Sequence, residues 1–166
     1  MSINFLKEKN PHPYDSRIEF DEEPHIYTID GEKGYTSVTT WIHQHFNEFN
    51  SDETISKMMM GKNWKNSKYF GMNPDEIKNL WDKSRIEASS AGTKLHHDIE
   101  CYYNNIKVSN DSIEYKYFLN FLDDHSTLKP YRTEWMIFDV TLKLAGSIHA
   151  IFENKDKTID IYDWKR

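Results

Sequence analysis

The sequence predicts an α+β fold in which helices come first and strands follow. Between about residues 36 and 122, apolar residues recur at helical spacing behind capping side chains. From Thr133 to Lys165, β-branched and aromatic residues gather in three runs that short polar turns separate. Three consecutive strands so connected are expected to pair as an antiparallel meander.

The individual elements follow from local signals. A short strand is expected over His25–Ile29, because its apolar residues alternate and Asp30-Gly31 offers a turn. Five helices are expected from capping residues and apolar spacing, over Thr36 to about Phe46, Ser51 to Gly61, Asn73 to about Ser89, Thr93 to Asn104, and from Asp111 onward. The three strands of the meander are expected over Thr133–Val140, Leu142–Glu153 and Thr158–Lys165.

Length and composition limit the classes of protein that fit. A chain of 166 residues should bury roughly 70% of its unfolded surface, which favours one domain over residues 1–166. Residues 1–90 are then a mostly helical N-terminal part and residues 91–166 the core. No apolar run approaches the roughly 20 residues of a membrane helix, so no membrane partner is expected. The single Cys101 excludes an internal disulfide, and together with the lack of a targeting segment it favours an intracellular protein, cytoplasmic or nuclear.

Charge is distributed unevenly along the chain. The formal net charge is −6, yet residues 57–94 hold eight basic and four acidic residues. Within this stretch, residues 57–70 contain four lysines and three aromatic residues and no acid. Such a segment can follow a phosphate backbone and stack on bases, through Lys57, Lys62, Trp64, Lys65 and Lys68. The same pattern also fits a solvated helix face above a Met and Trp core.

Several chemically active side chains are expected to meet where a helix packs on the sheet. Alternation along the last strand places Asp163 and Lys165 on the face of Ile159 and Ile161. On the preceding strand, His149 shares a face with Ser147, and on a helix His96 and Glu100 stand four residues apart. Carboxylates and imidazoles suit a divalent cation, and a nearby ammonium can hold a water or stabilise an anion.

Four motifs occur in a fixed order along the chain. They are Gly92-Thr-Lys-Leu-His96-His-Asp-Ile-Glu100, Glu134 within Tyr-Arg-Thr-Glu-Trp, Leu144-Ala-Gly-Ser-Ile-His149, and Ile161-Tyr-Asp163-Trp-Lys165. This set resembles the PD-(D/E)XK nuclease superfamily, and most closely its RecB-like branch, which includes mitochondrial genome maintenance exonucleases. The upstream Tyr35-Thr-Ser37-Val38-Thr39 is similar to the Ser-Val-Thr element of those exonucleases.

The resemblance implies a metal-dependent DNA nuclease with a restriction-endonuclease-like αβββ core. It implies an exonuclease or endonuclease of DNA replication or repair that acts on single strands or ends. The ligands of Mg²⁺ or Mn²⁺ would be His96, Glu100, His149 and Asp163. In this family logic Asp163 and Glu100 belong to the catalytic set, and Lys165 orients or deprotonates the attacking water. Ser37 and Thr39 would contact the nucleic acid.

Two features depart from the family pattern. Position 149 is histidine where the family has aspartate, which disfavours Mg²⁺ relative to Mn²⁺. A natural ligand variant, a degenerate nuclease and an engineered substitution all fit this difference. The chain also stops one residue after Lys165, before the family's final helix and strand, so we expect it to be the front part of a longer protein. The alternative functions are an inactive nuclease-like module that binds nucleic acid or a protein partner, and a structural α+β domain with an accidental motif match.

Overall fold

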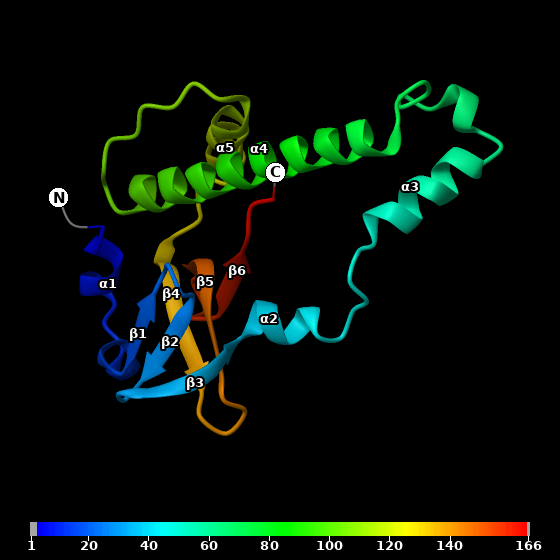
Figure 1. The fold of residues 1–166 in the computed structure, drawn as a ribbon. Coiled ribbons are helices and arrows are strands. Elements are labelled where there is room, and N and C mark those ends of the chain that lie inside the picture. Colours follow the sequence, from blue (N-terminus) through cyan, green and yellow to red (C-terminus); the bar gives the residue numbers. More distant parts are fainter. Residues whose placement is uncertain (1–2, 166) are drawn as a thin grey trace.

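The computed structural model describes residues 3–165 and is α+β, as the sequence predicts (Figure 1). Its helices are α1 (Phe5–Lys9), η1 (Pro13–Ser16), α2 (Val38–His43), α3 (Ser51–Met60), η2 (Trp64–Asn66), α4 (Pro74–Tyr103) and α5 (Ile113–Asp124). Its strands are β1 (Ile18–Asp21), β2 (Ile26–Ile29), β3 (Glu32–Ser37), β4 (Pro130–Asp139), β5 (Leu144–Glu153) and β6 (Ile159–Tyr162). Among the described residues, no helix is both long enough and apolar enough to span a membrane.

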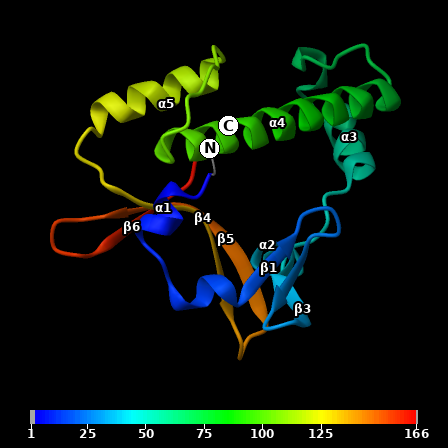
Figure 2. The same ribbon diagram turned by 90° about the vertical axis from the view of Figure 1, so that its left-hand side faces the viewer.

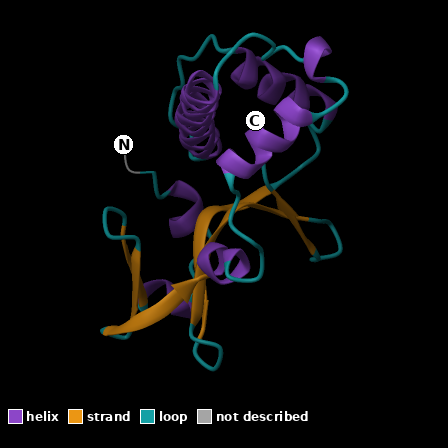
Figure 3. Cartoon of the chain, turned by 45° about the vertical axis from the view of Figure 1, so that its right-hand side comes forward, coloured by secondary structure: helices purple, strands orange, loops and turns teal. Residues whose placement is uncertain are grey.

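The strands, orange in Figure 3, form one mixed sheet. Their order is β1-β2-β3-β5-β4, with β6 also paired to β5. The predicted meander is confirmed, because β4 pairs antiparallel with β5 and β5 with β6. The β1–β3 strands belong to the N-terminal part of the chain, and β3 joins the meander by a parallel pairing with β5. The N-terminal part therefore contributes half of the strands of the sheet that the described residues form.

A gap along one edge of β5 positions the candidate site. β4 pairs with β5 along one edge, so β3 and β6 must share the other edge. On that edge β3 pairs with Leu144 and Ala145, whereas β6 pairs with Ala150 through Glu153. Residues 146–149 lie between these two pairings, and the chain leaves β6 at the end that borders them. Side chains from this gap and from the segment after β6 can therefore meet.

Two apolar clusters hold the layers together. The first lies where α1, α4 and α5 pack against β5 (Figure 2), and it consists of Leu6, Leu95, Ile99, Tyr103, Tyr115, Phe118, Ala150 and Phe152. Tyr162 and Trp164 pack against it from the end of β6. The second lies where the β1–β2 hairpin meets β5 and consists of Ile18, Tyr27, Ile29 and Ala145. The first cluster fixes the C-terminal half of α4 over the sheet.

Helix α4 is continuous, and the expected break at Gly92 is wrong. It begins as predicted at Asn73, whose side chain accepts a hydrogen bond from the backbone N–H of Glu76 at 3.0 Å. Every residue from 82 to 90 is exposed, so no element among the described residues 3–165 covers this stretch. The first turns of α4 pack with α3 and η2 into an extension that projects from the sheet, here called the arm (residues 51–81; Figure 1). Ile55 and Ile77 are its buried residues.

The ends of two other elements also differ from expectation. α2 spans only Val38–His43, whereas the sequence predicts a helix from Thr36 to about Phe46; Thr36 and Ser37 instead end β3. β6 ends at Tyr162, three residues before the predicted end of that strand. Ile159 and Ile161 are exposed rather than part of an apolar face, because Tyr162 is the β6 residue that packs against the core. Asp163 and Lys165 therefore lie beyond the strand and near the surface, not in a buried strand face.

Candidate metal centre

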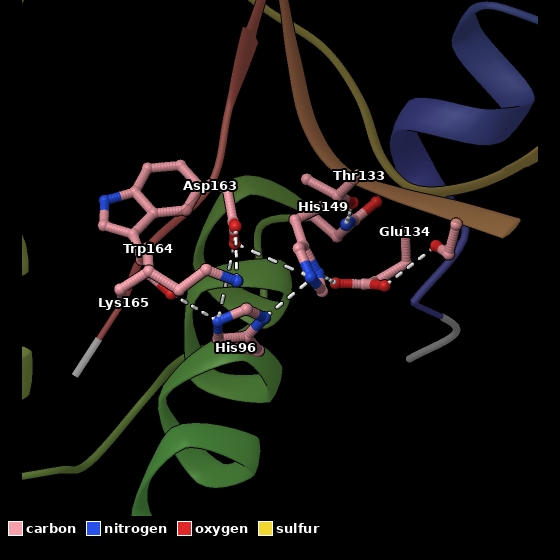
Figure 4. A network of polar contacts seen from close by, with 9 residues as sticks. His96, Thr133, Glu134, His149, Asp163, Trp164 and Lys165 are labelled. Atoms are coloured by element: carbon pink, nitrogen blue, oxygen red, sulfur yellow. Dashed lines mark hydrogen bonds and ion pairs between the residues drawn. The ribbon is translucent and has the colours of Figure 1, made fainter. Parts of the chain in front are cut away.

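Three residues from separate elements bring possible metal ligands together (Figure 4). His96 comes from α4, His149 from the gap along β5, and Asp163 from the segment after β6. The pairing of Ala150 with Tyr162 places Asp163 opposite His149 when the antiparallel register is continued by one residue. Each residue offers one ligand atom, and these atoms all lie within 4.8 Å of one another. The predicted convergence of His96, His149 and Asp163 thus agrees with their positions.

The distances to the carboxylate of Asp163 define the centre of the group. Asp163 Oδ1 lies 3.6 Å from His149 Nε2 and 4.0 Å from His96 Nε2. Its other oxygen, Oδ2, lies 2.6 Å from Lys165 Nζ. The Lys165 side chain is 80% exposed, so its ammonium can contact solvent or a ligand while it pairs with Asp163.

Glu134 lies behind His149, on β4. Its Oε1 is 2.8 Å from His149 Nδ1, and its Oε2 accepts a hydrogen bond from Ser147 Oγ at 3.0 Å. His96 connects to the same imidazole, because the two Nδ1 atoms are 3.0 Å apart. His96 Nε2 in turn lies 2.7 Å from the backbone oxygen of Trp164. Four side chains and one carbonyl therefore form a single polar network.

The acceptors in this network determine where the imidazole hydrogens lie. A carbonyl oxygen can only accept, so the contact with Trp164 requires a hydrogen on Nε2 of His96. The ionised carboxylate of Glu134 also only accepts, so Nδ1 of His149 carries a hydrogen. Since His149 Nδ1 has one hydrogen and directs it to Glu134, His96 Nδ1 at 3.0 Å can share that hydrogen only as a second, weaker acceptor. In a neutral His149 ring, the lone pair remains on Nε2.

This arrangement leaves two acceptors facing each other. A neutral His149 presents its Nε2 lone pair to Asp163 Oδ1 at 3.6 Å, a contact that is unfavourable unless a cation or a proton lies between them. An ion bound at about 2.1 Å can join donors up to roughly 4.2 Å apart, so both distances to Asp163 Oδ1 permit a shared ion. His96 joins as a ligand only by giving up its contact with Trp164, because that contact occupies Nε2.

The donor set fits a divalent cation that accepts nitrogen. Two imidazoles and one carboxylate suit the later first-row metals best, and Mn²⁺ accepts them more readily than Mg²⁺. Mg²⁺ strongly prefers oxygen ligands and fits two imidazoles poorly. The residues therefore fit one of the two expected cations, Mn²⁺, better than the other.

The pKa values of Glu134, His149 and Asp163 are shifted by their contacts with one another and with Ser147 and Lys165. Burial by itself raises the pKa of the Glu134 carboxyl, but hydrogen bonds from His149 and Ser147 outweigh it and hold that pKa below its usual range. The hydrogen bond to Glu134 raises the pKa of the His149 imidazole, against the opposing effect of burial. The pKa of Asp163 is also lowered, because its contact with Lys165 and the charge of His149 outweigh burial. Without a metal, a proton on His149 can therefore balance the two carboxylates.

Glu100, the fourth predicted ligand, does not belong to the three-residue group. It lies one turn further along α4, where burial and the negative charge of Glu134 raise the pKa of its carboxyl. With Glu134 it lines a small cavity of about 160 Å³ beside Asn104 and Arg132. The structure thus brings Glu100 near the back of the site, beside Glu134, rather than among the three candidate ligand residues.

The residues predicted to contact nucleic acid lie at a distance from this group. Lys62, Lys65 and Lys68 are exposed on the arm, and Lys57 pairs with Glu53 at 2.6 Å. A cleft formed mainly by the turn after α3 has a lining that includes Lys62 and Trp64. His96 stands 22 residues after Pro74 on α4, which is about 33 Å along the helix axis. The arm and the candidate metal centre are therefore at different ends of α4.

Ser37 and Thr39 lie at the junction of β3 and α2. Ser37 is buried and caps α2, because its Oγ accepts a hydrogen bond from the backbone N–H of Thr40 at 3.0 Å. The same Oγ donates to Thr40 Oγ1 at 2.8 Å. Thr39 is exposed. Ser37 thus has a structural role in the start of the helix, whereas the Thr39 side chain is open to solvent.

Two members of the network were missed as functional groups by sequence reasoning. The alternation of β5 places Ser147 on the face of His149, and this signal could have identified it. The carbonyl of Trp164 carries no side-chain signal, so only the three-dimensional structure reveals its contact with His96. Comparison of the chain with protein-family models, with curated proteins and with solved structures found no match.

Proposed function

We propose that this chain is a divalent-metal-dependent nuclease of the PD-(D/E)XK type, which hydrolyses phosphodiester bonds of DNA on single strands or at ends. The observation that carries the proposal is the convergence of His149, Asp163 and Lys165 beside His96. The chain order of α4, β4, β5 and β6, with antiparallel pairing of the three strands, supports the restriction-endonuclease-like αβββ core.

In this proposal the side chains of the site have separate roles in metal binding and in contact with the substrate. His149, Asp163 and His96 would hold Mg²⁺ or Mn²⁺, with Glu100 as an acidic group behind them. A bound cation supplies polarisation of a phosphoryl oxygen and lowers the pKa of a water. Lys165 contacts a phosphate oxygen or holds the attacking water, since its ammonium is exposed, and Asp163 keeps it in place through the 2.6 Å contact.

The arm is the proposed contact for the rest of the substrate strand. Its exposed lysines can pair with phosphates, and Trp64, which is half-buried and packs edge-on against Phe70, offers only part of its ring to a base. The exposed residues 82–90 of α4 lie between the arm and His96. A strand that uses both regions must therefore run along α4.

The direct test is cleavage of end-labelled single-stranded and double-stranded DNA in the presence of Mn²⁺, Mg²⁺ or a chelator. We expect cleavage that requires a metal and is abolished in Lys165→Ala. The matched control is Lys157→Ala, which removes another exposed lysine that pairs with a carboxylate, Glu153 at 3.1 Å. The control variant should cleave like the unchanged protein.

A second variant tests the departure at position 149. His149→Asp supplies a hard oxygen ligand, so it should raise cleavage that depends on Mg²⁺. The proposal is wrong if neither the unchanged protein nor His149→Asp cleaves any substrate with either cation. Equal activities of Lys165→Ala and Lys157→Ala would also contradict the role of Lys165.

One observation favours a second candidate, an inactive nuclease-like module that binds nucleic acid or a protein partner. His149 lies between Glu134 and Asp163, and its raised pKa allows an imidazolium to balance these carboxylates without a metal. DNA binding that is retained without any cleavage, and that does not respond to divalent cations, is the result expected for this candidate.

A further inference from the structure

The register of β4 against β5 places the carboxylate of Glu134 next to His149. Thr133 pairs with Ala150 and Trp135 with Ile148, so Glu134 lies directly across from His149. Both carboxylate oxygens of Glu134 accept hydrogen bonds from β5, one from Nδ1 of His149 and the other from the hydroxyl of Ser147. Glu134 is thereby held between two residues that share one face of β5.

The backbone of Glu134 is unusual at this position. Its φ is +42°, in the left-handed region, which residues other than glycine seldom adopt. Its neighbour Thr133 is fixed, because Thr133 Oγ1 accepts a hydrogen bond from Asn104 Nδ2 at 2.8 Å. On the other side, Arg132 is bound to Asp15 by two hydrogen bonds of 2.9 Å. Strained backbone that the surroundings hold in place is typical of functional sites.

The hydrogen bond to Glu134 decides which nitrogen of His149 is available. With Nδ1–H directed to the carboxylate, the lone pair of the neutral ring is on Nε2, which faces Asp163 Oδ1 at 3.6 Å. Metal-binding histidines generally donate their other N–H to a carboxylate or carbonyl in this way. The arrangement of Glu134, His149 and the space beside Asp163 matches that pattern.

We propose that Glu134 and Ser147 are positioning residues that fix His149 as a nitrogen ligand, and that the centre takes a first-row transition-metal cation in preference to Mg²⁺. The proposal rests on the metal centre of the proposed function but not on the cleavage of DNA. Imidazole suits the later first-row cations such as Co²⁺ and Zn²⁺, and Mn²⁺ accepts it more readily than Mg²⁺, which dehydrates reluctantly and selects oxygen. In this proposal His149 is a functional metal ligand and does not mark a metal centre that has lost its activity.

The first test measures metal binding to the full chain by calorimetry with Mn²⁺ and Mg²⁺, and by absorption spectroscopy with Co²⁺. We expect Mn²⁺ and Co²⁺ to bind and Mg²⁺ to bind at least about tenfold more weakly. Glu134→Ala should weaken Co²⁺ binding about 10- to 100-fold. Glu134→Gln should recover part of that loss, because its amide oxygen still accepts from Nδ1. Glu153→Ala, which removes a carboxylate elsewhere on β5, is the control and should leave binding unchanged.

The second test reads the ring of His149 directly. Nitrogen NMR of the metal-free protein, at a pH where the ring is neutral, should show the hydrogen on Nδ1. This signature should be lost in Glu134→Ala, weakened in Ser147→Ala and kept in Glu134→Gln. A role of Glu134 in stability alone would not move the ring hydrogen, so thermal unfolding of the same variants separates the two roles.

The outcomes distinguish this proposal from the proposed function. Binding of Mg²⁺ as tight as that of Mn²⁺ and Co²⁺ would overturn the proposal, even if Mg²⁺ supports DNA cleavage. Unchanged Co²⁺ binding in Glu134→Ala would overturn it as well. Selective Co²⁺ and Mn²⁺ binding without cleavage of any DNA would uphold it and refute the nuclease function.

Discussion

Replacing Asp15 by alanine is expected to destabilise the protein strongly, because it leaves a buried cation without its counterion. The side chain of Arg132 is 3% exposed and that of Asp15 14% exposed. Arg132 donates two hydrogen bonds to Asp15 and one to the backbone oxygen of Asn10. Removing one partner of a buried ion pair costs about 3–5 kcal/mol. For a domain of this size, that loss lowers Tm by roughly 10 °C.

The exposed pair of Arg17 and Asp30 provides a matched control. It has the same chemistry and a bidentate geometry, with the two side chains 35% and 49% exposed. Asp30→Asn, which removes the charge and tolerates the left-handed φ of +52° at this position, should therefore have a far smaller effect, because solvent screens the exposed pair. Urea unfolding and differential scanning calorimetry of both variants measure the difference. Similar small losses for Asp15→Ala and Asp30→Asn would refute the reasoning from burial.

The same pair predicts a pH dependence. Burial alone raises the pKa of Asp15, but hydrogen bonds from Arg132 and His12 bring it below the ordinary value of 3.8. A group with a lowered folded pKa stabilises the fold above its unfolded pKa and loses that contribution as pH falls through the folded pKa. The stability difference between the unchanged protein and Asp15→Ala should be full at neutral pH and shrink below about pH 4. A difference that stays constant into strong acid would contradict this origin.

Three further predictions concern other parts of the molecule. Reversing the charge of Lys62 and Lys65 should weaken single-stranded DNA binding and reduce its salt dependence, whereas the control Lys155→Glu should not. Fluorescence anisotropy at several salt concentrations measures both effects. Equal effects of the variants and the control would indicate that Lys62 and Lys65 only form a solvated helix face. Gly92→Ala should stabilise the fold by about 0.5–1 kcal/mol in urea unfolding, because a Cβ there meets nothing within 4 Å. Asn104→Ala should lower the free energy of unfolding by about 1–3 kcal/mol, because the buried backbone N–H of Leu6 loses its acceptor. An unchanged free energy of unfolding would contradict this prediction.

Local signals predicted the starts of several elements well. The Asn73 cap followed by Pro74 marks the first residue of α4, and Gly61 follows α3 as expected. The error at Gly92 has a physical cause. A glycine in a helix costs only about 1 kcal/mol relative to alanine. Leu95 and Ile99, in the following turns, gain burial against the core and outweigh that cost.

Strands β1 and β3 were not predicted, and β1 pairs locally with β2, so the omission of β1 was an error of local reasoning. Non-local pairing explains the other omission, the parallel pairing of Thr36 and Ser37 in β3 with Leu144 and Ala145. These partners are more than 100 residues apart, so no local pattern specifies their contact. The gap along β5 that exposes His149 follows from that pairing and was equally beyond prediction.

The candidate site was predictable in its residue types but not in its connections. The convergence of His96, His149 and Asp163 was predicted, but Asp163 reaches it from the segment after β6 and not from the apolar strand face that periodicity indicated. The link from Glu134 to His149 depends on the register of β4 against β5 and on a left-handed φ, which periodicity does not encode. Glu100 shares a face with His96 on the helix, yet one turn of rise carries it toward Glu134 instead of Asp163.

A crystal structure of the protein grown with Mn²⁺, with anomalous data, tests the central claim most directly. We predict an anomalous peak between His149 Nε2 and Asp163 Oδ1, within coordination distance of both atoms, with Glu134 still hydrogen-bonded to Nδ1 of His149. A peak elsewhere, or no peak while His149 stays bridged between Glu134 and Asp163, would contradict a metal centre at this position.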